Sequence, residues 1–220
     1  MPARAFIVAI DGPAASGKGT LARRLAERFK LAHLDTGKLY RAAAFLVLSQ
    51  GADPADPKAA SAAAQRVDPV LLADPRLQGE AVAQASSIVA AIPAVRAALL
   101  DRQRDFAAHP PAGFRGAVLD GRDIGTAICP GAAVKLFVTA SPEARAERRL
   151  KELRQRGATA IYGDVLQDMK ERDARDSERR VAPLAAAPDA VTIDTTGLDA
   201  DQAFEQASEI IERALAAYGC

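Results

Sequence analysis

Short apolar runs alternate along the chain with longer stretches in which apolar residues recur every three or four positions. The uninterrupted runs are typical of strands buried on both faces of a parallel sheet, and they span residues 6–10, 31–34, 117–120, 134–138 and 191–194. Helical spacing appears at Leu21, Leu25 and Phe29, and again over residues 40–48, 81–91, 93–106, 142–156, 161–180 and 200–217. This alternation predicts an α/β fold, a doubly wound parallel sheet of five strands with helices around it. Residues 58–79 are weakly patterned, and no element is predicted there.

Composition places the chain among ordinary globular proteins. It has 220 residues, of which 49% are hydrophobic and 26% charged, enough for one α/β domain. No apolar run reaches the roughly 18 residues of a membrane helix, and the first residues lack the pattern of a signal peptide. Cys129 and Cys220, with His33 and His109, form neither a disulfide framework nor a zinc motif. We therefore expect a reduced, cytoplasmic protein without a membrane partner, working as a monomer.

Basic residues gather in one region of the chain. The formal net charge is only +1, yet eleven lysines and arginines lie between residues 143 and 180, interleaved with carboxylates. One interpretation is a solvated pair of helices with surface ion pairs, and the other is a set of guanidinium groups that bind phosphates. Acids nearly balance bases and only one aromatic residue, Tyr162, interleaves with them, which argues against nucleic acid as a partner.

A glycine-rich segment joins the first predicted strand to the first predicted helix. The residues that would cradle the phosphates of a nucleotide are Gly12, Pro13, Ala14, Ala15, Ser16, Gly17, Lys18, Gly19 and Thr20. Backbone N–H groups of such a loop converge on phosphate oxygens, and the helix that follows adds its dipole. Lys18 would neutralise the β- and γ-phosphates, and the hydroxyl that usually follows this lysine is displaced from position 19 to Thr20. A glycine-rich turn without a ligand is the alternative.

A carboxylate ends the third predicted strand, where Asp120 precedes Gly121-Arg122-Asp123. At that point Asp120 is suited to hold Mg²⁺, or its water shell, beside the phosphates, and Thr20 would add a hydroxyl. The alternative is an aspartate that serves a turn or caps a helix.

The lysine-glycine-threonine form of the phosphate loop resembles nucleoside monophosphate kinases, and three further segments narrow the resemblance to the bacterial cytidylate kinase family. They are Leu-Asp-Thr-Gly-Lys-Leu-Tyr-Arg at residues 34–41, Asp-Gly-Arg-Asp-Ile-Gly-Thr at residues 120–126, and Glu-Arg-Asp-Ala-Arg-Asp leading to Val-Ala-Pro-Leu at residues 171–184. The resemblance runs from about Ile7 to the C-terminal helix. It implies ATP-dependent phosphorylation of CMP and dCMP to CDP and dCDP in pyrimidine metabolism, with Mg²⁺ as cofactor and these small molecules as the partners.

The resemblance also implies how the single domain is divided. A P-loop kinase core is expected over about residues 1–49, 107–156 and 181–220, a helical insert that binds the acceptor over about 50–106, and a lid over about 157–180. Family members often carry a longer insert with a small antiparallel sheet, for which residues 67–80 are too short.

Roles for single residues follow from the same resemblance. The cytosine ring is expected to contact Ser87, Arg96 and Asp123. The acceptor phosphate is expected against Thr36, Arg41, Arg122 and Arg179, and the sugar hydroxyls against Arg172 and Asp176. Tyr40 is also expected among the residues that bind the substrate. The lid would bring Arg148 and Arg156 to ATP, and the catalytic set would be Lys18, Arg122, Arg148 and Arg179.

Helical geometry gives an independent view of residues 171–180. If this segment is helical, one stripe roughly 100° wide contains Arg172, Arg175, Asp176 and Arg179. A carboxylate among three guanidinium groups suits a sugar phosphate. The alternative is a ladder of ion pairs within the helix, each worth a few tenths of a kcal/mol.

Two other functions stay open on these observations. One is a phosphotransferase with another acceptor, such as UMP, AMP or a small metabolite, because the phosphate loop does not distinguish acceptors. The other is a non-catalytic module, which would bind ATP without acceptor-dependent release of ADP. The arginine-rich region argues against the second, because binding alone needs no second phosphate site.

Overall fold

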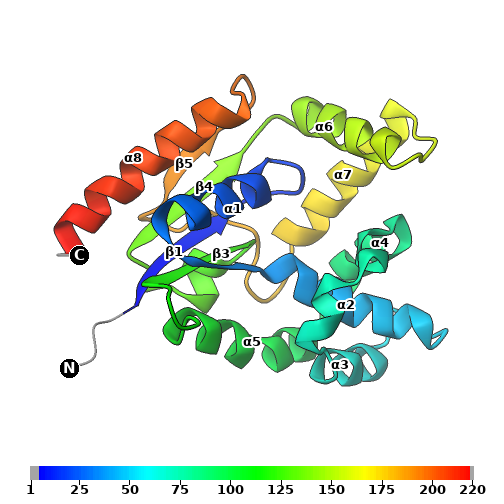
Figure 1. Ribbon diagram of the computed structural model, residues 1–220. Helices are drawn as coiled ribbons and strands as arrows, with labels where there is room; N and C mark the ends of the chain where they lie inside the picture. The colour runs from blue at the N-terminus through cyan, green and yellow to red at the C-terminus, as the bar shows by residue number, and fades with distance from the viewer. Residues whose placement is uncertain (1–4, 219–220) are drawn as a thin grey trace.

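A single parallel sheet forms the centre of the computed structural model, which describes residues 5–218 (Figure 1). The five strands are β1 (Phe6–Asp11), β2 (Ala32–Asp35), β3 (Gly116–Gly121), β4 (Val134–Thr139) and β5 (Val191–Asp194). All neighbouring strands are parallel, in the order β2-β3-β1-β4-β5. The chain crosses from β1 to the edge strand β2, returns to β3 beside β1, and then continues on the other side of β1 to β4 and β5. This order confirms the predicted doubly wound α/β fold.

Helices connect the strands and end the described chain. They are α1 (Lys18–Phe29), α2 (Thr36–Ser49), α3 (Pro57–Gln65), α4 (Glu80–Ala90), α5 (Pro93–Ala108), α6 (Pro142–Gln155), α7 (Tyr162–Ser177) and α8 (Ala200–Tyr218). Two 3₁₀ helices, Pro69–Ala73 and Pro75–Gln78, precede α4, and a π-helical turn, Ile124–Ile128, follows β3. Figure 1 shows α2 to α4 and the α6–α7 pair beyond the same end of the sheet.

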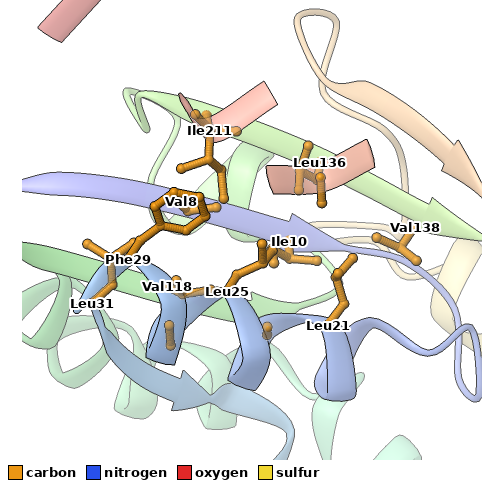
Figure 2. Close-up of a cluster of buried hydrophobic side chains, with 14 of the residues drawn as sticks. Val8, Ile10, Leu21, Leu25, Phe29, Leu31, Val118, Leu136, Val138 and Ile211 are labelled. Atoms are coloured by element: carbon orange, nitrogen blue, oxygen red, sulfur yellow. The ribbon is translucent and has the colours of Figure 1, made fainter. Parts of the chain in front are cut away.

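The core lies on both faces of the sheet because successive side chains of a strand point to opposite sides. Val8 and Ile10 of β1 pack with Leu25 of α1 and Ile211 of α8 on one face (Figure 2). The residue between them, Ala9, packs toward α5 on the other face. Complete burial of an aliphatic side chain contributes roughly 1.5–3 kcal/mol, so β1 is held firmly at the centre. The loop that follows β1 therefore starts from a fixed position.

Residues 58–79, where no element is predicted, contain most of α3 and the two 3₁₀ helices. Each of these helices begins with an aspartate followed by proline, and each aspartate side chain accepts a hydrogen bond from the backbone two residues later. The buried face of α3 consists of three alanines, so its apolar pattern is weak although the helix is packed. The segment therefore holds helical turns rather than strands.

Helix α2 begins four residues before its predicted start. The Asp35 side chain accepts a hydrogen bond from the backbone N–H of Lys38 at 3.2 Å and so caps the helix from the end of β2. The strand therefore leads directly into the helix, and Thr36, Tyr40 and Arg41 all lie in the first turns of α2.

Two remaining expectations concern membranes and cysteines. Within residues 5–218 no single helix is long and apolar enough to cross a bilayer, and α4 with α5 meets that measure only as a pair bent by 96°. Burial raises the pKa of the Cys129 thiol to about 11, so this thiol stays protonated at neutral pH. Cys220 lies outside the described residues.

Candidate active site

A cavity of about 400 Å³ opens at the carboxyl ends of β1, β2 and β3, where ligands bind in doubly wound sheets. Residues 12–20, here called the P-loop, close one side, and α2, α4, α6 and α7 supply the other walls. The predicted site residues that line it are Ala14, Ala15, Lys18, Gly19, Thr36, Tyr40, Arg41, Ser87, Arg96, Asp120, Arg122, Asp123, Arg172, Asp176 and Arg179. The fold thus brings residues from distant parts of the chain into one site.

The P-loop turns sharply through backbone conformations that favour glycine. Gly12 has φ 151°, and a Cβ placed there would lie 2.0 Å from the carbonyl oxygen of Val138. Gly17 has φ 88° and precedes α1. Ala15 also lies in the left-handed region, with φ 57°, which costs an L-residue about 1–2 kcal/mol. Such strain persists where the surroundings hold it, and it is common at ligand sites.

Lys18 is a buried cation within this loop. The residue is only 9% exposed, and Nζ donates a hydrogen bond to the carbonyl oxygen of Pro13 at 3.0 Å. Burial, followed by repulsion from Arg122, lowers the pKa of Lys18 to about 7. A phosphate group in the cavity would offset both effects and restore the charged form. The sequence motif and the electrostatics therefore agree on an anionic ligand.

Arginines on the same cavity have unused hydrogen-bonding capacity. Burial and repulsion from Arg122 lower the pKa of Arg172 to about 9, and burial and Arg149 lower the pKa of Arg41. Within residues 5–218, Nε of Arg172 and Nη2 of Arg179 are buried and have no hydrogen-bond partner. Buried donors without acceptors are rare, because each costs about 1–3 kcal/mol. A second anion is the ligand that these nitrogens fit.

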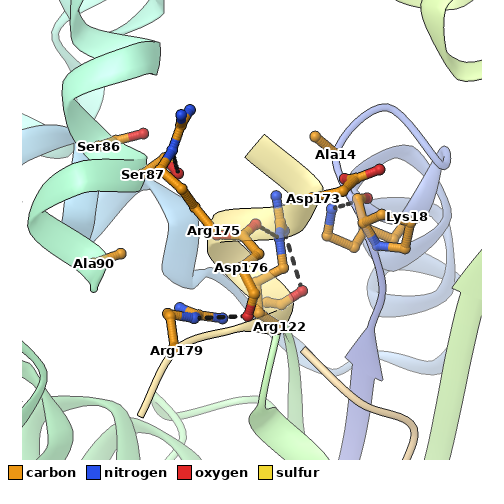
Figure 3. A network of polar contacts seen from close by, with 12 residues as sticks. Ala14, Lys18, Ser86, Ser87, Ala90, Arg122, Asp173, Arg175, Asp176 and Arg179 are labelled. Atoms are coloured by element: carbon orange, nitrogen blue, oxygen red, sulfur yellow. Dashed lines mark hydrogen bonds and ion pairs between the residues drawn. The ribbon is translucent and has the colours of Figure 1, made fainter. Parts of the chain in front are cut away.

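Asp176 joins α7 to the loop after β3. Its Oδ2 accepts a hydrogen bond from Nε of Arg122 at 2.9 Å (Figure 3). Burial alone would raise the pKa of Asp176, but Arg122, Arg172 and Arg179 outweigh it and hold that pKa below its ordinary value. The contact with Arg122 crosses between elements, so the alternative, a ladder of ion pairs within the helix, does not describe Asp176.

Helix α7 ends at Ser177, three residues before its predicted end. Arg172, Arg175 and Asp176 therefore share the helix, whereas Arg179 lies beyond it and does not belong to the predicted stripe. Nε of Arg179 still donates to the carbonyl oxygen of Asp176 at 3.0 Å, which keeps the guanidinium group on the same cavity.

The three residues expected to contact a base lie on three segments of the cavity wall: Ser87 on α4, Arg96 on α5 and Asp123 in the loop after β3. Arg96 of α5 forms a buried ion pair with Asp123, and its guanidinium group lies 5.7 Å from the centre of the Tyr40 ring. Oγ of Ser87 accepts a hydrogen bond from Nε of Arg175 at 3.3 Å. Figure 3 shows Ser87 and Lys18 on opposite sides of the Arg122–Asp176 contact, so the cavity offers separate places for two ligands.

Carboxylates stand beside the P-loop at the ends of two strands. Asp35 and Asp120 are register partners on β2 and β3, and Oδ1 of Asp120 lies 2.7 Å from Nε2 of His33. A Cβ placed on Gly19 would lie 3.6 Å from Oδ2 of Asp120, so this carboxylate adjoins the P-loop. Burial and the charge of Asp120 raise the pKa of Asp35. Within residues 5–218 no group of three or more acidic, histidine or cysteine side chains is arranged to hold a metal ion.

Several predicted residues do not line the cavity. Thr20 is exposed on α1. Four other P-loop residues also do not line the cavity: Gly12, Pro13, Ser16 and Gly17. Arg148 turns toward the segment after β5, where Nη1 donates to Oγ1 of Thr195 at 2.9 Å. Arg156 donates to the side-chain carbonyl of Gln78 at 2.8 Å. The structure thus places neither of these two arginines on the cavity.

Arg149, which the sequence pattern does not single out, faces the cavity instead of its neighbour Arg148. Its guanidinium group is paired with Glu80 of α4 and, at 2.9 Å, with Glu152 of α6. Successive helical residues are about 100° apart, so only one of two adjacent arginines turns to a given side. Which of the two arginines turns to the cavity depends on how α6 is rotated about its own axis against the sheet. Tertiary packing sets that rotation.

A further buried carboxylate supports the loop that carries Asp123. Asp11, the last residue of β1, accepts hydrogen bonds from the backbone N–H groups of Ile124 at 2.7 Å and Gly125 at 2.8 Å. Burial raises the pKa of Asp11 to about 6, although these two hydrogen bonds oppose the shift. The native state thus holds the Asp11 proton more tightly than the unfolded chain does.

Relative to the Asp11→Asn variant, the wild-type protein should gain stability as the pH falls from about 8 to about 5. The folded pKa of about 6 exceeds the ordinary 3.8, so the stabilisation is complete at low pH and is lost as pH rises through 6. Over this range the unfolding free energy of the wild type should rise by about 1.4 kcal/mol relative to that of the variant. Urea denaturation at the two pH values measures it, and a constant difference would contradict the raised pKa.

The structure combines a parallel sheet, a P-loop and a second group of buried guanidinium nitrogens without hydrogen-bond partners. These features define a P-loop kinase, an enzyme that moves a phosphoryl group between two bound anions. The family model described as cytidylate kinase matches residues 8–213. The chain belongs to the cytidylate kinase family, and it is a phosphotransferase with ATP as the phosphoryl donor.

Relatives named cytidylate kinase match nearly the whole chain. The protein of Rhodospirillum rubrum is 62% identical over 206 residues, which cover 94% of this chain and 97% of the relative. That of Paramagnetospirillum magneticum is 62% identical over 93% of this chain and 97% of its own length. The relative from Granulibacter bethesdensis is 58% identical, with 94% and 97% covered.

Solved structures agree on the fold. The unliganded crystal structure of a sugar kinase from Janibacter sp. HTCC2649 aligns with a TM-score of 0.51, covering 96% of this chain and 95% of that chain. At 14% sequence identity this likeness concerns the α/β architecture alone.

Proposed function

We propose that this chain transfers the γ-phosphoryl group of ATP to the phosphate of CMP and dCMP. The observation that carries the proposal is a single cavity that joins the P-loop to the buried Arg96–Asp123 pair. The unpartnered nitrogens of Arg172 and Arg179 line the same cavity. A nucleoside monophosphate would place its base at the pair and its phosphate at the arginines. The relatives named cytidylate kinase support cytosine as the base.

Catalysis by this site needs no nucleophilic side chain, because the acceptor phosphate is already ionised at neutral pH. The rate would come from aligning donor and acceptor and from neutralising charge on the transferring group. Lys18 lies on the donor side, and Arg41, Arg122, Arg172 and Arg179 would hold the acceptor phosphate. Asp176 uses Oδ2 for Arg122, which leaves Oδ1 for a sugar hydroxyl.

Mg²⁺ would be held beside the P-loop by Asp120, with Asp35 as the second carboxylate. When bound, the ion neutralises charge on the donor phosphates. His33 contacts Asp120 and so orients that carboxylate, as outer partners of metal ligands do. Thr20, being exposed on α1, is less well placed than these carboxylates.

The arginine of the α6 helix that would meet the transferring phosphoryl group is Arg149. Its side chain is 14% exposed and lines the cavity, where its charge lowers the pKa of Arg41 and of Arg172. A phosphate would compete for it with Glu80 and Glu152, so Arg149 is held at the cavity by groups that a ligand replaces. Arg148 is committed to Thr195 and serves the segment behind the P-loop.

Arg149→Met is therefore expected to lower kcat about 100-fold or more, with smaller changes in KM for ATP and CMP. The reason is that charge on the phosphoryl group grows in the transition state, where a guanidinium group contributes most. Arg154→Met, an exposed change in the last turn of the same helix, is the matched control and should keep normal kcat. A normal kcat for Arg149→Met would contradict this role and mean that another residue meets the transferring phosphoryl group.

The function itself is tested by ADP release from Mg·ATP with CMP, dCMP, UMP, AMP and GMP offered separately. CMP and dCMP should give the fastest release, and the purine nucleotides should give little above the rate without acceptor. Fastest release with UMP or AMP would make the choice of acceptor wrong. Release that ignores the acceptor would contradict a kinase function.

A further inference from the structure

Arg145 joins three parts of the molecule through one buried guanidinium group. Its Nε donates to the carbonyl oxygen of Ala140, at the end of β4, at 3.0 Å. Nη1 donates to the carbonyl oxygen of Ala14 in the P-loop at 3.3 Å. Nη1 and Nη2 also bind both carboxylate oxygens of Asp173 on α7, at 3.2 and 2.6 Å. The side chain of Arg145 is 4% exposed, and it does not line the cavity.

The contact with Ala14 fixes how one P-loop peptide is turned. In a planar trans peptide the C=O and the following N–H point in opposite directions. Because the carbonyl oxygen of Ala14 points to Arg145, the N–H of Ala15 points the other way, toward the cavity that both alanines line. Ala15 holds φ 57°, a conformation that an alanine keeps only under constraint. Ala15 packs against the buried cluster of Ala146 on α6 with Val165 and Met169 on α7, which adds an apolar constraint.

We propose that Arg145 is a positioning residue that aims the Ala15 N–H at the phosphates of ATP, and that Asp173 orients Arg145. The inference rests on the proposed function in that ATP is the ligand of the P-loop. Asp173 lies on α7 between the acceptor-side residues Arg172 and Asp176, and Figure 3 shows it on the side of the helix that faces Ala14 and Lys18. The ion pair therefore ties the donor cradle to the helix that holds the acceptor.

The test separates donor binding from acceptor binding. Titration calorimetry measures Kd for a non-hydrolysable ATP analogue without acceptor, and Kd for CMP without donor. Arg145→Lys keeps the charge but cannot reach three partners, and it should raise Kd for the ATP analogue about 10-fold or more. Asp173→Asn keeps the shape but weakens the bidentate pair, and it should raise that Kd about threefold or more. Kd for CMP should change less than about twofold in both.

Asp164→Asn, an exposed change in the first turn of α7, is the matched control and should bind both ligands as the wild type does. Thermal unfolding of each variant identifies general loosening of the fold. Wild-type affinity of both variants for the ATP analogue, or equal weakening of both ligands, would overturn the positioning role. If the wild type binds the analogue and CMP but the variants do not differ from it, only this inference fails. A wild type that binds neither ligand would instead contradict the proposed function.

Discussion

Lys18→Met is expected to lower kcat about 1000-fold or more, the largest effect of any single change in the site. Nζ of Lys18 sits within the P-loop, hydrogen-bonded to the carbonyl oxygen of Pro13. Its charge acts on the donor phosphates, where negative charge moves as the phosphoryl group leaves. Methionine fills a similar space but carries no charge, so it removes the electrostatic contribution and leaves the packing in place. Steady-state release of ADP with saturating CMP measures the change.

The same variant should unfold at the wild-type temperature or above it. Lys18 is buried, not exposed, and its lowered pKa shows that burial opposes the charged form. An apolar side chain avoids that cost. Lys151→Met, an exposed change on α6, is the matched control and should keep full turnover. Near-normal kcat in Lys18→Met would contradict the assignment of the P-loop.

The second large effect concerns the choice of base. Cytosine offers acceptors at O2 and N3 and a donor amino group at N4, whereas uracil has a donor at N3 and an acceptor at O4. An arginine only donates hydrogen bonds and a carboxylate only accepts them. Arg96 would therefore favour O2 and N3 of cytosine, and Asp123 would favour the amino group. Each contact also disfavours uracil, so both contacts increase the preference for cytosine over uracil.

The structure changes how this preference has to be tested, because Arg96 and Asp123 form a buried ion pair with each other. Removing Arg96 alone leaves an uncompensated buried carboxylate, which costs about 3–5 kcal/mol of stability. The double variant Arg96→Met/Asp123→Asn removes both charges and keeps the fold testable. Arg102→Met is the matched control on α5, since that guanidinium group donates to the carbonyl oxygen of Val67 and does not line the cavity.

The wild type should prefer CMP over UMP by about 10⁴-fold in kcat/KM, because a site of buried hydrogen bonds rejects the wrong analogue strongly. In the double variant this ratio should fall to about 10-fold or less, mainly through loss of activity with CMP. Competition between CMP and UMP at equal concentration measures the ratio directly. If the double variant kept the CMP-to-UMP ratio of the wild type, Arg96 and Asp123 would not determine the choice of base.

Much of the fold can be predicted from the local sequence pattern, and the wrong predictions are confined to short segments. Apolar runs such as residues 6–10 and 134–138 predict strands because both faces are buried, and β1 and β4 form there. Helix α3 escapes the pattern because alanine contributes little contrast between its buried and exposed faces. The end of α7 is missed because a charged sequence continues past Ser177 while the helix stops.

The site is predictable where a motif specifies both residue and position, as at Lys18, Asp120 and Asp123. All three lie on the cavity. What local pattern cannot supply is the direction of a side chain on a helix that is placed by tertiary packing. Arg148 and Arg149 are neighbours in the sequence, yet the first contacts Thr195 and the second faces the cavity. Local pattern does not predict the Arg145–Asp173 ion pair either, because the two residues are 28 positions apart in the sequence and meet only in the folded structure.

The most direct test of the central claim follows the phosphoryl group itself. ATP with a radioactive γ-phosphate is incubated with the wild-type protein, Mg²⁺ and CMP, and the nucleotides are separated over time. The label should appear in CDP at the rate at which ADP forms, because the acceptor is the phosphate of CMP. Label released as inorganic phosphate while CMP stays unchanged would contradict the transfer that this site is proposed to perform.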